Sequence, residues 1–144
     1  MGIMGEFTVL SQSVVSLMPT QPAAQSATAT AALDFNDDTV EIVATGLPNP
    51  SVFGNDPSTG RPFNVYEAWL LDTAQNLFAS IGNMRLQQGA YRIHGTAPIS
   101  LREFNAVAIT AEDKSGPQTA NGPFIMMGTF REAIRKPTPT KPLG

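Results

Sequence analysis

The sequence contains no cysteine and a single histidine, His94. The absence of cysteine excludes disulfide bridges and every zinc, haem-thiolate or iron–sulfur site that needs a thiolate ligand. His94 has no nucleophile beside it in the sequence, and a lone histidine on a strand is more often a surface or packing residue. These absences argue against a metalloprotein and against histidine-based catalysis.

Charge is also scarce, because only 15% of the 144 residues are charged, against about 25% in average proteins. Glu6 is the single ionisable side chain in residues 1–33. Residues 1–130 carry eleven acidic and five basic side chains, whereas residues 131–144 carry four basic and one acidic. The net charge of −3 makes a nucleic-acid partner unlikely on electrostatic grounds.

Long apolar runs are missing as well. No run approaches the roughly 18 residues that a transmembrane helix needs, so we expect no transmembrane segment. Residues 1–7 lack a basic region, and four polar residues interrupt Thr8–Met18, so we expect no secretory signal peptide in this chain. An alternative interpretation of residues 1–7 is an artificial extension added before the natural chain.

The loops lack the sequence motifs of calcium binding and of phosphate binding. The acidic pairs Asp37–Asp38 and Glu112–Asp113 lack the spacing of a calcium loop. The segment Gly116–Gly122 has no lysine and precedes a strand, so it does not match a phosphate-binding loop. We therefore predict a protein that is not an enzyme, with no catalytic residues, no cofactor and no metal.

What the sequence has in abundance is alternation of apolar and polar residues, which is typical of β-strands. Turn-forming residues separate the alternating segments at the spacing of an antiparallel sandwich. The sequence thus predicts an all-β fold, an antiparallel β-sandwich of about seven strands. The predicted strands are Thr28–Phe35, Thr39–Thr45, Phe63–Asp72, Leu77–Met84, Ala90–Gly95, Phe104–Thr110 and Pro123–Phe130.

The predicted core combines apolar residues from several of these segments. Phe63–Asp72 is apolar on both faces, which predicts a central strand covered on both sides. Its aromatic residues are assigned to packing in preference to a carbohydrate platform. The predicted core residues are Val40, Ile42, Phe63, Val65, Tyr66, Trp69, Leu71, Phe104, Val107, Ile109, Phe124 and Met126.

A second apolar segment precedes the predicted sandwich. As a strand, it places Phe7, Val9, Val15 and Leu17 on one face and Leu10, Val14 and Met18 on the other. A helix is an alternative, but five hydroxyl or β-branched residues in Ser11–Ser16 favour a strand. The sequence therefore predicts an N-terminal arm with a linker, residues 1–26, in which Pro19–Ser26 is extended.

The C-terminal residues form a third segment. Residues 131–144 are rich in proline and threonine, and Lys136–Pro142 is typical of polyproline II structure. Arg131, Arg135, Lys136 and Lys141 make this tail basic. We thus expect three parts, an arm and linker at 1–26, a β-sandwich domain at 27–130 and a basic tail at 131–144.

Residues 28–130 resemble the C-terminal extracytoplasmic domain of anti-sigma-K factors. Tyr66–Asp72 matches that family's Tyr-x-x-Trp-Leu strand and follows the Gly-Leu-Pro turn at 46–48. Leu77–Gly82, Phe104–Glu112 and the Gly-Pro strand at 122–125 match its later strands. The resemblance implies a β-sandwich that works outside the cytoplasm. It does not imply anti-sigma activity, because the family's sigma-binding helices and transmembrane helix have no counterpart here.

Two functions compete at this point. The first is a self-assembling structural protein, extracellular or at the cell surface, whose arm adds a strand to a neighbouring copy and so builds a filament. The arm could instead fold back into its own domain. The second is a sensory or ligand-binding sandwich with a surface formed by loops Ser51–Pro62 and Glu112–Gly122. A small-molecule ligand fits the second function, and copies of the chain are the partners in the first.

Overall fold

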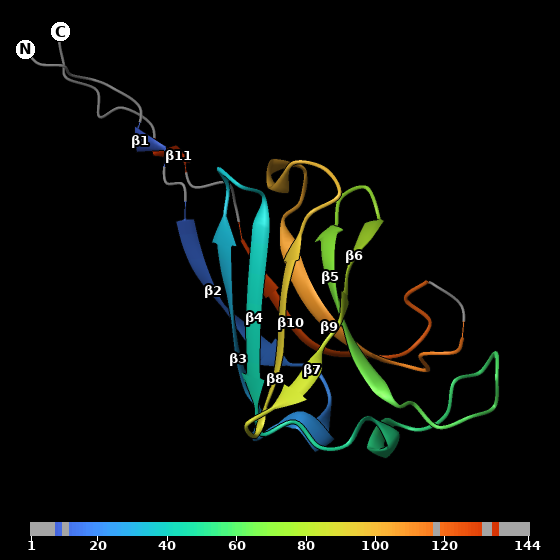
Figure 1. Cartoon of the computed structure of the whole chain (residues 1–144). Helices are drawn as coiled ribbons and strands as arrows, with labels where there is room; N and C mark the ends of the chain where they lie inside the picture. The colour runs from blue at the N-terminus through green and yellow to red at the C-terminus, as the bar shows by residue number, and fades with distance from the viewer. Residues whose placement is uncertain (1–7, 10–11, 117–118, 131–133, 136–144) are drawn as a thin grey trace, which may run out of the picture.

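The structure is a computed structural model, and it describes residues 8–9, 12–116, 119–130 and 134–135. These residues form strands joined by loops and three short 3-10 turns, as Figure 1 shows. The strands are β1 (Thr8–Val9), β2 (Gln12–Pro19), β3 (Thr28–Asp34), β4 (Thr39–Thr45), β5 (Val65–Asp72), β6 (Leu77–Asn83), β7 (Arg85–Gln87), β8 (Ala90–Thr96), β9 (Ala106–Glu112), β10 (Phe124–Thr129) and β11 (Ile134–Arg135). The turns are η1 (Pro22–Ala24), η2 (Pro50–Phe53) and η3 (Leu101–Glu103).

Nine of these strands form one antiparallel sheet, in the order β6-β5-β9-β10-β2-β3-β4-β8-β7. The sheet curls until its two ends meet, so it is nearly closed. Only Met84 separates β6 from β7 in the sequence. The two strands at opposite ends of the sheet order are therefore consecutive in the chain. β1 and β11 form a separate two-stranded ladder.

The all-β class is confirmed, but the predicted number of about seven strands was too low, and the predicted antiparallel sandwich is not confirmed because nine strands form one nearly closed sheet. All seven predicted segments contain a strand, and β2 and β7 are the additions to the main sheet. β7 is three residues long and follows β6 after Met84 alone, so it is too short to show a period-2 alternation of its own. A two-residue turn with positive φ at Gln88 and Gly89 then pairs β7 with β8.

The seam between the sheet ends depends on glycine. A Cβ on Gly95 of β8 would lie 2.5 Å from Cγ2 of Ile81 on β6, so this close approach of the strands requires glycine. Ile81 is the extra residue of a β-bulge, because Gly82 opposes Ala68 and Ser80 opposes Trp69. Gly82, next to the bulged residue, has a φ of +133°, a backbone conformation that favours glycine.

The strand β2 bridges the two halves of the sheet. It pairs with β3 through six residue pairs, from Gln12↔Asp34 to Leu17↔Ala29. Its end then pairs with β10 through Met18↔Met127 and Pro19↔Met126. The linker that follows is not fully extended, because it contains η1 and buries Ala24. The segment 12–19, assigned above to an arm, is thus a strand of the sheet in its own chain.

The main core fills the inside of the curled sheet. Of the predicted core residues, Val40, Ile42, Phe63, Tyr66, Phe104, Val107, Ile109 and Met126 are buried there. Val65 is half-buried, and Phe63 packs with the main core although the alternation pattern placed it on the face of Trp69.

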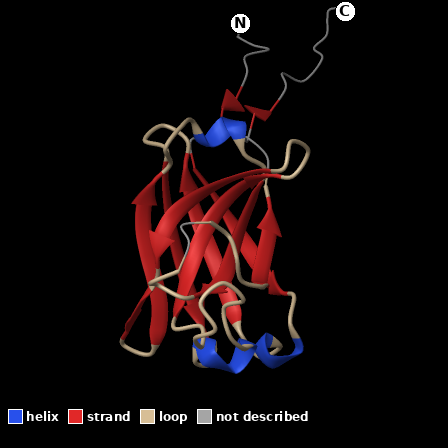
Figure 2. Ribbon diagram, turned by 90° about the vertical axis from the view of Figure 1, so that its right-hand side faces the viewer, coloured by secondary structure: helices blue, strands red, loops and turns tan. Residues whose placement is uncertain are grey.

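A second, smaller cluster lies on the outer face of β5 and β9. Trp69 and Leu71 are buried there with Ala106 and Ala108, and the half-buried Phe78, Phe124, Met127 and Ala120 pack against them. The Trp69 indole N–H donates to the Thr110 hydroxyl at 2.8 Å. Figure 2 shows the connection between β9 and β10 crossing in front of these strands, which explains how an outer face can be covered.

We predict that Trp69→Ala lowers the free energy of unfolding by about 3–5 kcal/mol, because only 3% of the Trp69 surface is exposed. Urea denaturation followed by circular dichroism measures the loss. Val14→Ala, on an exposed side chain, is the control and should change stability by less than about 0.5 kcal/mol. A loss below about 1 kcal/mol for Trp69→Ala would show that the outer cluster is not a packed core.

Candidate functional site

The residues predicted for the assembly arm divide between two faces of β2. Val15 and Leu17 are buried in the main core, whereas Val14 and Met18 are 72% and 65% exposed on the outer face. Val9 lies in β1, where it pairs with Ile134. Phe7 and Leu10 lie outside the described residues. The chain itself therefore buries the apolar side chains on the inner face of β2 and leaves those on its outer face exposed.

The junction of β2 with β10 is short but close. Next to the two residue pairs that join these strands, the Thr20 N–H donates to the Ile125 carbonyl at 2.8 Å. A Cβ on Gly128 would lie 2.6 Å from the Ser16 carbonyl oxygen, so the two backbones touch there. β2 is consequently held by a full ladder on one side and by a few contacts on the other.

The outer face of β10, β2 and β3 is free of charge over most of its length. The sequence has no charged residue from position 12 to position 33. Neutral side chains cover this face up to Asp34 at the end of β3. They are Gln12, Val14, Ser16, Met18, Thr28, Thr30, Ala32, Phe124, Met127 and Thr129.

The basic tail is described only in part. Arg135 lies in β11 and pairs with Thr8, which brings the tail alongside the N-terminal segment. Arg131, Lys136 and Lys141 lie outside the described residues, so their contacts with a neighbouring copy stay a prediction.

The two loops proposed for ligand binding do meet, but their polar groups bind one another. Asp113 accepts hydrogen bonds from the Thr59 hydroxyl, the Arg61 Nε–H and the Asn64 amide, at 2.7, 3.2 and 3.1 Å. Asp56 accepts from the Asn121 amide at 2.8 Å. Asp113 and Asp56 thus tie loop 51–62 to loop 112–122.

These hydrogen bonds also set the ionisation of Asp113. Donation by the Thr59 hydroxyl, and next by the Ser115 backbone N–H, holds the pKa of the Asp113 carboxyl well below its ordinary value of 3.8, against an opposing effect of burial. Glu112 accepts from the backbone N–H groups of Asn121 and Gly122. The Asp113 carboxylate therefore holds the two loops together, the Glu112 carboxylate holds residues 112–122 in place, and both are engaged by donors of the chain itself.

The remaining candidates are turn or surface residues. Asp38 accepts from the Leu101 N–H at 2.9 Å, and the Asp34 carboxylate accepts from the N–H groups of Asn36 and Asp37. His94 is exposed on β8, opposite Glu41 on β4. Within the described ranges, no three potential ligand residues gather as a metal site. No helix in that part of the chain has the length and apolar character needed to cross a membrane.

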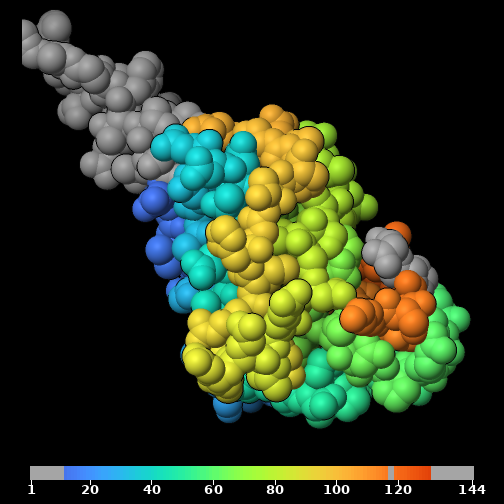
Figure 3. Space-filling model, viewed as in Figure 1, coloured from blue at the N-terminus to red at the C-terminus, as the bar shows by residue number. Residues whose placement is uncertain are grey.

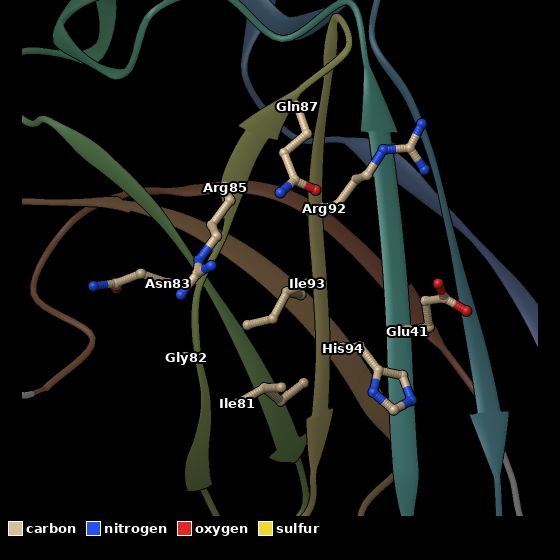
Figure 4. Close-up of a pocket in the computed structure, with 9 residues that line it drawn as sticks. All are labelled: Glu41, Ile81, Gly82, Asn83, Arg85, Gln87, Arg92, Ile93 and His94. Carbon is tan, nitrogen blue, oxygen red and sulfur yellow. The ribbon is translucent and has the colours of Figure 1, made fainter.

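The sequence reasoning missed a groove beside the seam between β6 and β8. Figure 4 shows its lining, to which β4, β6, β7 and β8 all contribute. Arg85 of β7 and Arg92 of β8 are directly opposite each other in this hairpin. The Gln88–Gly89 turn could have revealed this pairing, because a two-residue turn fixes the register of the flanking strands.

We predict that Asp113→Asn lowers the melting temperature at pH 7, because the variant cannot carry the charge that the loop donors stabilise. A depressed carboxyl pKa contributes stability above the unfolded-state pKa, and this contribution is lost as the pH falls below about 4. The difference between wild type and variant, measured by thermal melts from pH 7 to pH 2, should therefore shrink toward low pH. Asp37→Asn, on an exposed turn, is the control; a constant difference at all pH values would contradict the assignment.

Comparison with known proteins provides no family for this chain. Scans against protein-family models, curated proteins and solved structures returned no match. The resemblance to the anti-sigma-K domain stays a prediction, and the arguments for function therefore come from the geometry.

Proposed function

We propose that this chain is a non-enzymatic structural protein that assembles into filaments by exchanging its N-terminal strand β2 between copies. The observation that carries the proposal is the place of β2 in the sheet. It lies between β10 and β3, so it joins a β6-β5-β9-β10 half to a β3-β4-β8-β7 half. Without β2, no strand pairing joins the two halves at that point.

A terminal strand of this kind can be supplied by a neighbour. The β2 of one copy can make the same ladder with β3 and the same contacts with β10 in the next copy. Each exchange then leaves the donor ready to accept a strand from a further copy. A head-to-tail contact that does not close on itself produces a filament.

The energy available to an exchanged strand is substantial. Val15 and Leu17 are buried, and burying such side chains contributes about 1.5–3 kcal/mol each. The six-pair ladder with β3 adds main-chain hydrogen bonds. Because the contacts within one copy and between copies are the same, protein concentration and the opening of the linker decide which form is populated.

The uncharged outer face supports contact between copies. A second copy that covers β10, β2 and β3 short of Asp34 would meet no like charge and would not have to desolvate one. Val14 and Met18 lie at its centre and are among the exposed large hydrophobic residues of the described chain. The resemblance to an extracytoplasmic domain supports a location outside the cytoplasm or at the cell surface.

The sensory alternative receives less support from the geometry. Its proposed surface, loops 51–62 and 112–122, uses Asp56, Asp113 and Asn121 to bind the loops to each other. A receptor for a small molecule would need some of these groups to face the ligand.

The first test is refolding at different protein concentrations. Protein unfolded in urea and refolded at millimolar concentration should contain dimers and longer oligomers by light scattering, because open chains then meet a neighbour's β2 before their own. Refolding at micromolar concentration should give monomers. Monomers at every concentration would contradict strand exchange.

The second test supplies the strand as a separate molecule. A chain lacking residues 1–19 should be less stable and should not form oligomers, because Val15 and Leu17 leave the core. A synthetic peptide of residues 8–20 should bind it and raise its melting temperature. The matched control is the peptide with Leu17→Ser, which should bind weakly, whereas the peptide with Val14→Ser should bind like the original. Equal behaviour of the two altered peptides would contradict insertion of β2 through its inner face.

A further inference from the structure

The groove beside the β6–β8 seam has a chemistry that the assembly proposal does not use. It has a volume of about 470 Å³ and is lined by Glu41, Ile81, Gly82, Asn83, Arg85, Gln87, Arg92, Ile93 and His94. In Figure 3 it lies where the surface passes from β6 to the β7–β8 hairpin. A second, more open hollow is lined by Gln87, Gln88 and Arg92.

Two arginines of the groove occupy a position that is unfavourable by itself. Arg85 and Arg92 are direct cross-strand partners, and like charges in such a pair destabilise a hairpin. Arg85 is exposed and Arg92 is half-buried. In Figure 4 their guanidinium groups diverge, Arg85 toward Asn83 and Arg92 toward β4, as repulsion between them requires.

Neither arginine is neutralised within the described part of the chain. The ion pair found there joins Arg61 to Asp113, in a different loop region. The side chains of Arg85, Arg92, Asn83 and Gln87 have no hydrogen-bond partner among the described residues. The groove thus presents two cations and, between them in Figure 4, the Gln87 amide as donors that are free to bind a ligand.

We infer that this groove binds a multivalent tetrahedral oxyanion, such as pyrophosphate or a phosphate ester, between Arg85 and Arg92. An anion with two or more charges would remove the cross-strand repulsion, and planar guanidinium groups bind phosphate oxygens in pairs. Glu41 lies on β4 opposite His94, and its negative charge repels an anion from that end of the groove. The anion therefore sits at the Arg85, Arg92 and Gln87 end of the groove.

The test is a calorimetric titration of the full-length protein with pyrophosphate at low ionic strength. Arg85→Gln and Arg92→Gln should each weaken binding about tenfold, because each removes a charge-assisted contact. Glu41→Gln should tighten binding, because it removes the opposing charge. Lys114→Gln and Glu103→Gln change the net charge equally outside the groove and should leave binding within about twofold of wild type.

A second readout separates binding from folding. Pyrophosphate should raise the melting temperature of the wild type and not of Arg92→Gln. Without anion, Arg92→Gln should melt at or above the wild-type temperature, because the variant lacks the like-charge pair. Inorganic phosphate and glycerol phosphate distinguish a free ion from an ester, whereas chloride at equal ionic strength should not bind.

The inference is wrong if pyrophosphate fails to bind saturably, if it binds no better than chloride, or if Lys114→Gln weakens binding as much as Arg92→Gln. None of these variants touches β2, so this result and that of the refolding experiment do not depend on each other.

Discussion

The pairing of β2 with β3 on one side and with β10 on the other is the interaction on which the rest of the structure depends. It turns two four-stranded halves into one nearly closed sheet, and it places Val15 and Leu17 against the core. The opposite seam has no such ladder and is closed by Met84, which passes from β6 to β7, and by the contact of Gly95 with Ile81. Closure of the sheet is therefore strong at the N-terminal strand and weak beside the groove. The two proposed functions use these two seams, assembly the first and anion binding the second.

The distribution of charge follows the same division. The outer face of β10, β2 and β3 is uncharged up to Asp34 at the end of β3, whereas the β7–β8 hairpin carries two arginines and a histidine. The buried acidic side chains Asp56, Glu112 and Asp113 lie in a third region, where Asp56 and Asp113 tie loops 51–62 and 112–122 together and Glu112 bonds within the second loop. The absence of cysteine means that packing, strand pairing and these hydrogen bonds stabilise the fold without disulfides.

Alternation predicted the local structure well, because period 2 reports which residues of a strand face a core. It located the seven strands from β3 to β10 other than β7, and it detected that β5 is covered on both faces. It could not predict which strands are neighbours, since the pairing of β2 with β10 joins residues more than a hundred positions apart. It also missed β7, whose three residues are too few to show a period. The groove was missed for the same reason, because the pairing of Arg85 with Arg92 can be predicted only when the register of the β7–β8 hairpin is known.

Exchange of β2 is the central claim, and the lack of cysteine allows a direct measurement of it. Ser16 and Thr30 are exposed cross-strand partners on β2 and β3. Protein carrying Ser16→Cys is mixed with protein carrying Thr30→Cys, unfolded and refolded together at millimolar concentration, and oxidised. The account predicts a disulfide between the two different chains on a non-reducing gel, while a chain with both substitutions refolded at micromolar concentration forms the bond internally. Absence of the mixed disulfide, when the internal one forms readily, would contradict strand exchange.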